Sequence, residues 1–286
     1  MNSVLSLNQT IGVYEISVLI SFALLGVATT QTYIYFTRFP DDSIKLKTLV
    51  TVVWLCEVAH AGCIGHALYS YTITAYSHPD ILLHVPISLG VAIFFAGIIT
   101  ACVQGFFTFR IYVFSETLFI PILLWTTLFL CLLGSLAAFV LELRSTSLAD
   151  YEAQCWWLFM TIWSLSAANN VTITVTLVVI LYRRRPNVLQ MTTALVDQVI
   201  VWTIETGMLT SAVSIVTLIC FITIRGSFIW LAITSRLFSN SLLASLNSRT
   251  ALRATDEIPS TSLKLSDDLI SRVSGLVFVD GTHTIP

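Results

Sequence analysis

Long hydrophobic segments separated by short polar connections make up most of this chain. Each segment is about as long as the ~20 residues that a helix needs to cross a bilayer. The hydrophobic runs are continuous rather than alternating, which argues against a β-barrel and for helices, whose backbone is satisfied within the segment. The pattern therefore predicts an all-α polytopic membrane protein, a bundle of seven transmembrane helices. The expected spans are residues 11–36, 48–74, 87–111, 118–141, 155–182, 197–224 and 227–247.

Composition supports this interpretation. Of the 286 residues, 56% are hydrophobic and only 10% are charged, too few to cover a water-exposed surface. Residues 1–10 lack the basic region of a cleaved signal peptide, so we expect a short extracellular N-terminus and a retained signal-anchor as the first span. Residues 248–286 are rich in Ser, Thr and mixed charges, which predicts a flexible cytoplasmic tail.

The distribution of Lys and Arg predicts the orientation. These residues gather in 37–47, at Arg110, in 183–185 and after residue 248, whereas the alternate connections hold only Arg144 and Arg225. By the positive-inside rule, the N-terminus lies outside and the C-terminus lies in the cytoplasm. The expected location is the plasma membrane or a membrane of the secretory pathway.

Charged residues within the spans are the first candidates for function, because ionisable groups in hydrocarbon are costly. Glu57 in span two and Arg236 in span seven both lie near the middle of the ~30 Å layer, counting 1.5 Å per residue. We therefore expect them to pair, with His60 beside Glu57 one turn along the same helix face. The pair could fix helix register, form the floor of a polar pocket, or belong to a proton or ion relay.

Other polar residues complete the candidate site. His66 is turned about 120° from His60 and lies two turns further out, so these histidines and Glu57 cannot hold one metal ion. No metal and no cofactor are expected. We predict a ligand or ion-pair pocket between spans two, three, six and seven. Its candidate residues are Glu57, His60, His66, Gln104, Asn169, Glu205, Arg236 and Asn240.

Several local predictions accompany the spans. Asp197 is expected to cap span six, and Arg110 to reach the headgroups from the inner end of span three. Span four holds no ionisable residue and is expected to face lipid, and the six cysteines fall within or at the edges of spans as unpaired thiols. A hydroxyl stripe on span six either lines a pore or bonds its own helix. The stripe consists of Thr203, Thr206, Thr210, Ser214 and Thr217.

Several function classes are disfavoured. A retinal protein needs a lysine in span seven, and the only lysines are Lys45, Lys47 and Lys264. The inner end of span three lacks the acid-Arg-aromatic triplet of large receptor classes, no nucleophile–base cluster suggests an enzyme, and no basic platform suggests nucleic acid. The absence of an internal repeat argues against, without excluding, a transporter.

Five motifs carry a family resemblance, at residues 31–36, 38–42, 53–57, 203–211 and 240–249. With them the chain resembles a large family of seven-span proteins from mushroom-forming fungi (basidiomycetes), known from its C-terminal half as domain of unknown function 6534. The resemblance covers 12–253 and is densest over about 167–250. Glu57, Glu205 and Arg236 stand where members often carry Asp, Asn and Lys. The resemblance implies the fold and assigns no activity.

Taken together, these features favour a receptor-like or sensory membrane protein with a polar pocket inside the bundle. A small-solute or proton transporter is the alternative, and a structural membrane component without a ligand is the second alternative. The expected partners are the lipid bilayer, a small-molecule ligand and a cytoplasmic protein bound by the loops and tail.

Overall fold

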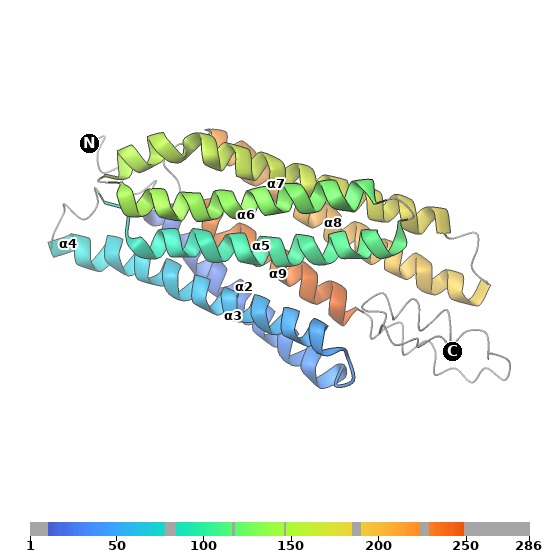
Figure 1. The fold of residues 1–286 in the computed structure, drawn as a ribbon. Helices are drawn as coiled ribbons and strands as arrows, with labels where there is room; N and C mark the ends of the chain where they lie inside the picture. The colour runs from blue at the N-terminus through green and yellow to red at the C-terminus, as the bar shows by residue number, and fades with distance from the viewer. Residues whose placement is uncertain are drawn as a thin grey trace, which may run out of the picture.

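The computed structural model describes residues 11–77, 84–115, 118–145, 147–184, 190–223 and 229–248, and this part of the chain is helical without a strand. Seven long helices run back and forth along one direction (Figure 1). A π-helical turn and the short helix α4 continue α3. The long helices are α2 (Val13–Arg38), α3 (Ile44–Tyr69), α5 (Ile87–Phe114), α6 (Phe119–Arg144), α7 (Leu148–Arg184), α8 (Gln190–Thr223) and α9 (Ile229–Asn247).

Five segments within the described residues are long and apolar enough to cross a membrane. They lie in α2, in α3 with its continuation, in α5, in α6 and in residues 153–183 of α7. Helix α8 contains a shorter apolar stretch, Thr206–Ile219. The chain is therefore a multi-pass membrane protein, while the number of seven crossings and their orientation stay predictions from the sequence.

The ends of two helices differ from the predicted ones. Helix α7 begins at Leu148, where the hydroxyl of Ser147 accepts the backbone N–H of Asp150 at 3.2 Å, a capping contact. Helix α8 begins at Gln190, so Asp197 lies inside it and the predicted cap is wrong. Hydropathy marks only the part of a helix that suits lipid, and both helices continue beyond that part through polar residues.

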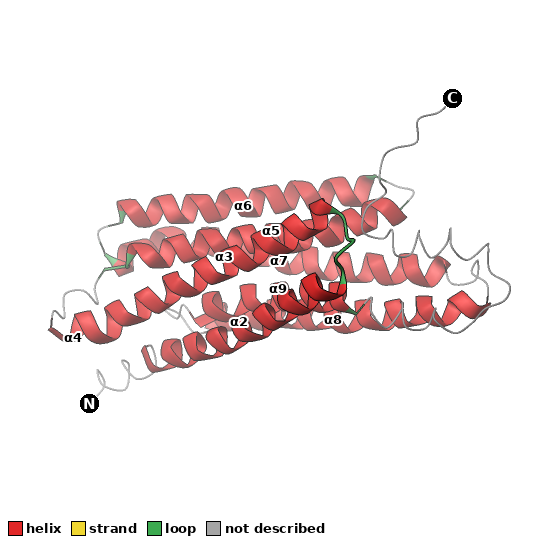
Figure 2. Cartoon of the chain, turned by 90° about the horizontal axis from the view of Figure 1, so that it is seen from below, coloured by secondary structure: helices red, strands yellow, loops and turns green. Residues whose placement is uncertain are grey.

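Helix α5 is the centre of the arrangement, because it contacts α3, α6, α7 and α9. Helices α2 and α9 lie side by side and run in the same direction (Figures 1 and 2). The largest apolar core fills the space among α2, α3, α5 and α9. Its buried members include Tyr35, Val50, Ile99, Phe238 and Leu242.

Small residues allow close approach of neighbouring helices, as is common in membranes. A Cβ atom at Gly97 of α5 would lie 2.7 Å from Ser135 Cβ on α6. A Cβ atom at Gly207 of α8 would lie 2.6 Å from Thr174 Cγ2 on α7. The close α5–α6 and α7–α8 contacts at these two positions are thus possible because glycine has no side chain.

Helix α6 exposes an apolar face, as predicted for span four, with Ile122, Phe129 and Leu133 among its exposed side chains. It nevertheless carries an acid, because the helix extends to Arg144 and includes Glu142. The Glu142 side chain is buried and occupies the space beside Gly90 of α5. The predicted segment 118–141 holds no charged residue and no histidine, and Glu142 follows directly after its end.

Arg110, near the C-terminal end of α5, is buried in the bundle instead of reaching outward. Its guanidinium donates to Ser245 Oγ of α9 at 3.2 Å and lies 5.9 Å from the ring centroid of Phe107. A hydroxyl and an aromatic face thus replace the headgroups that the sequence suggested. The cysteines in the described part of the chain are free thiols, as predicted, while the side chain of Cys220 lies outside the described residues.

Candidate functional site

A fully buried arginine joins three helices. The Arg236 guanidinium on α9 forms an ion pair with the carboxylate of Glu57 on α3 and donates to the Glu57 backbone carbonyl at 2.9 Å. Its Nε donates to Ser21 Oγ on α2 at 2.9 Å, and its Nη2 lies 3.2 Å from His60 Nδ1. The predicted pairing of Glu57 with Arg236 is confirmed, with His60 adjacent. Ser21, which the sequence did not single out, adds α2 to the cluster.

This contact fixes the protonation of His60. A guanidinium only donates hydrogen bonds, so His60 Nδ1 must be the acceptor and the ring proton lies on Nε2. The imidazole is therefore neutral in this arrangement, and the charges of Glu57 and Arg236 balance each other. Asn240, one turn further along α9, donates to the Arg236 carbonyl at 2.8 Å and to the Leu24 carbonyl of α2 at 3.2 Å.

A second polar network joins α5, α7 and α8. Gln104 on α5 is buried and donates to Asn170 Oδ1 at 3.0 Å and to Ser166 Oγ at 3.1 Å, both on α7. Asn170 in turn donates to Ser214 Oγ on α8 at 2.7 Å. Asn169, the neighbouring candidate, accepts a bond of 2.8 Å from Thr127 of α6. Four helices thus meet at a chain of neutral hydrogen bonds.

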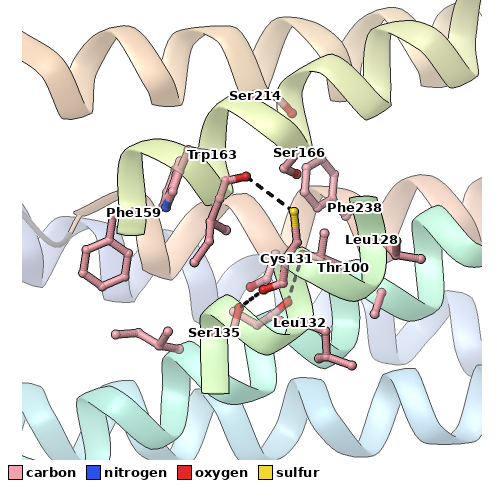
Figure 3. A pocket seen from close by; sticks show the side chains of 16 residues that line it. Thr100, Leu128, Cys131, Leu132, Ser135, Phe159, Trp163, Ser166, Ser214 and Phe238 are labelled. Carbon is pink, nitrogen blue, oxygen red and sulfur yellow. Dashed lines mark hydrogen bonds between the residues drawn. The ribbon is translucent and has the colours of Figure 1, made fainter. Parts of the chain in front are cut away.

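A pocket of about 90 Å³ lies beside this network (Figure 3). Helices α5, α6 and α7 supply most of its wall, and α8 and α9 contribute Ser214, Ser235 and Phe238. Phe159, Ile162 and Trp163 form the α7 side. Among the described residues that line it, none is Asp, Glu, Lys, Arg or His. The pocket is thus apolar and aromatic, with a few hydroxyl groups.

The structure separates the predicted site residues into distinct places. The described pocket lies among α5, α6, α7, α8 and α9 and takes no residue from α3. Glu57 and His60 lie in the ion-pair cluster, and a ligand pocket between spans two, three, six and seven stays a prediction. The hydrophobic pattern could not show which face of each span turns inward. His66 is exposed and its Nδ1 lies 3.0 Å from Ser88 Oγ, apart from both centres. The side chain of Glu205 on α8 lies outside the described residues.

Part of the hydroxyl stripe on α8 bonds its own helix. Thr210 Oγ1 donates to the Gly207 carbonyl at 3.1 Å, and Ser214 Oγ donates to the Thr210 carbonyl at 2.8 Å. Both side chains are buried, and Ser214 is turned to Asn170 of α7. This arrangement favours the helix-bonding interpretation over a pore. The side chain of Thr203 lies outside the described part of the chain.

Asn170 is expected to contribute more to stability than Asn169. Asn170→Leu removes two hydrogen bonds that connect α5, α7 and α8, and each such bond in a membrane protein contributes about 0.6 kcal/mol. We expect a lower melting temperature in detergent and a loss of roughly 1 kcal/mol. Asn169→Leu is the matched control, because the Asn169 side chain accepts one bond of 2.8 Å from Thr127 and donates to Gln104 only at 3.5 Å. An equal or larger loss for Asn169→Leu would contradict this ranking.

Comparison with known proteins gives a family match over part of the chain and no activity. No curated protein and no solved structure matches the chain. The segment that matches a family model, residues 166–251, begins in the second half of α7 and continues through α8 and α9. It includes Asn170, Ser214, Ser235 and Arg236, which means that both polar centres and the pocket draw residues from it. Residues 166–251 match the sequence model of a family of unknown function, DUF6534.

Proposed function

We propose that this chain is a seven-span, receptor-like membrane protein that senses a small, largely apolar molecule bound in the pocket among α5, α6, α7, α8 and α9. The observation that carries the proposal is the pocket itself: aromatic and aliphatic walls, a few hydroxyls and no charged side chain among its described lining residues. Ligand sites in proteins typically combine a mainly apolar wall with a small number of polar groups.

The size of the pocket restricts the ligand. A cavity of about 150 Å³ holds benzene, so a pocket of about 90 Å³ suits a molecule of roughly four to six non-hydrogen atoms. Transfer of an ion into such surroundings would be strongly unfavourable, because a buried charge without a partner loses its hydration. A neutral, membrane-permeable compound is therefore the ligand class that this site fits.

The pocket is connected to both polar centres. Ser166 and Ser214 line it and belong to the Gln104 network. Ser235 lines it and directly precedes Arg236, which holds α9 to α2 and α3. A ligand that binds one packing of these helices better than another shifts the population between them, which is the requirement for a sensor.

A proton transporter is the second candidate, and the buried Glu57–Arg236–His60 cluster is the observation that favours it. Ionisable groups in the interior of a membrane bundle often mark proton pathways. Against this, each charge of the cluster is paired, and the cluster does not line the pocket. We therefore propose that the cluster stabilises the packing of α9 against α2 and α3.

The test combines binding with transport. Purified protein is screened by thermal shift against neutral compounds of four to six non-hydrogen atoms, and proteoliposomes are assayed for proton and solute flux. The proposal is supported if a compound stabilises the native chain. Ala96→Phe, which fills the pocket, should abolish this stabilisation. Ala23→Phe, at an exposed position on α2, should retain it.

Two results would overturn the sensor. Flux that Glu57→Gln abolishes would assign the chain to transport. The chain would be assigned a structural role if no compound stabilised it and if the Glu57 and Arg236 variants changed only its stability.

A further inference from the structure

Ser235 on α9 carries the one hydroxyl among the described residues lining the pocket that has no hydrogen-bond partner. We propose that Ser235 binds the polar atom of the ligand, and that the ligand is a small hydrocarbon carrying a single alcohol or carbonyl oxygen. This inference rests on the proposed function and specifies the chemistry of the same site.

The hydroxyls from α5 and α6 in the pocket are already engaged. Thr100 Oγ1 donates to the Ala96 carbonyl at 2.9 Å, and Ser135 Oγ donates to the Cys131 carbonyl at 3.1 Å. Both are bonds to the preceding turn of the same helix, the usual arrangement for hydroxyls in a membrane helix. The proton of each hydroxyl is therefore used in a bond to the backbone, and Figure 3 marks the bond made by Ser135.

The hydroxyls from α7 and α8 belong to the neighbouring network. Ser166 Oγ accepts from Gln104 at 3.1 Å. Ser214 Oγ donates to the Thr210 carbonyl at 2.8 Å and accepts from Asn170 at 2.7 Å. A ligand oxygen that displaced Gln104 from Ser166, or Asn170 from Ser214, would break a bond that holds two helices together.

Ser235 is different from these four residues. Its side chain is 2% exposed, and its Oγ has no hydrogen-bond partner among the described residues, even in the preceding turn of its own helix. Buried polar atoms are nearly always bonded, and a free one in a pocket wall is satisfied when a complementary group enters. A hydroxyl both donates and accepts, so it suits an alcohol or a carbonyl oxygen equally.

The rest of the wall accounts for the remainder of the ligand. Phe159, Ile162 and Trp163 line the pocket from α7 and offer apolar surface to a hydrocarbon body. Figure 3 shows Phe159 and Trp163 on this side. The described lining residues provide no cation for a carboxylate and no acid for an amine. Ser235 directly precedes Arg236 in the chain, so the proposed bond would be made to the helix that carries the arginine of the ion pair.

The experiment uses xenon as an apolar probe of the pocket and 1-butanol as the oxygen-bearing probe. Binding of xenon to the full chain in detergent is followed by ¹²⁹Xe NMR, and each organic probe is titrated to displace it. We expect Ser235→Ala to bind xenon normally but to require about 3- to 10-fold more 1-butanol for displacement, the loss of one hydrogen bond. 1-Chlorobutane, of similar size without a hydroxyl, should displace xenon equally from both proteins.

Ser135→Ala is the matched control, since it removes a hydroxyl from the same pocket that is bonded to its own helix. It should leave the 1-butanol titration unchanged. Equal displacement by 1-butanol in the native chain and Ser235→Ala, or an equal loss in Ser135→Ala, would overturn the role of Ser235 and leave the pocket intact. Failure of the native chain to bind xenon would overturn the proposed function itself.

Discussion

Replacing Arg236 with leucine should lower the free energy of unfolding by about 3–5 kcal/mol, the cost of leaving the partner of a buried ion pair uncompensated. Glu57 would remain fully buried with an uncompensated carboxylate, and Ser21 and His60 would lose the guanidinium that they contact. Because these residues lie on α2 and α3, the variant should loosen both helices from α9. The measurement is unfolding of the purified protein, by melting temperature in detergent and by denaturant titration.

Two further variants separate the ion pair from a general effect of losing an arginine. Arg38→Leu changes an exposed arginine at the end of α2 and should alter stability by less than about 0.5 kcal/mol. Arg236→Leu combined with Glu57→Leu should recover much of the loss, because well-packed apolar residues often replace a buried ion pair at little cost. The stabilising role of the ion pair would be contradicted if Arg236→Leu were as stable as the native chain. It would also be contradicted if the double variant were less stable than either single variant.

The ion pair could be predicted from the sequence because the membrane leaves few alternatives. A carboxylate and a guanidinium at matching depth in hydrocarbon cannot be hydrated, so each is stabilised by pairing with the other. Counting residues from the span ends was therefore sufficient to pair Glu57 with Arg236. The same count could not find Ser21, since a serine is inexpensive at any depth and gives no signal of its own.

The pocket could not be predicted, for a different physical reason. In a soluble helix the apolar face marks the core, whereas a membrane helix is apolar on every side, and its inward face must be found from packing. The sequence therefore predicted a pocket beside the charged residues of span two, whereas the pocket of the structure lies among α5, α6, α7, α8 and α9. Ser235 and Ser166 resemble other hydroxyls in apolar segments, and only their neighbours distinguish them.

Helix ends show the same limit. Hydropathy located the segments that suit lipid within a few residues for α2 and α5. It could not locate the start of α8 at Gln190, because the added turns contain polar residues that a helix accepts outside hydrocarbon. For α7, the cap by Ser147 was readable in principle, since Asp150 follows three residues later in the pattern of a capping box.

Close packing of α5 on α6 gives the second large effect. Gly97→Ala should destabilise the protein by about 1–3 kcal/mol, the usual cost of inserting a methyl group into a filled contact. The new Cβ would lie 2.7 Å from both Cβ and Oγ of Ser135, a distance at which one helix must move. Gly97 and Ser135 also line the pocket, so the variant should weaken xenon binding as well as lower the melting temperature.

A glycine without neighbours provides the control. Gly62 of α3 has no atom within 4 Å of a built Cβ, so Gly62→Ala should be neutral or stabilising by up to about 1 kcal/mol through helix propensity. Ser135→Gly removes the atoms that an alanine at 97 would meet, and the double variant should therefore lose less stability than the sum of the two single variants. Additive losses, or similar losses for Gly97→Ala and Gly62→Ala, would show that α5 and α6 do not touch at this point. A smaller loss in the double variant would instead locate the contact at this pair, because Ser135→Gly removes the two atoms that the alanine at position 97 would meet.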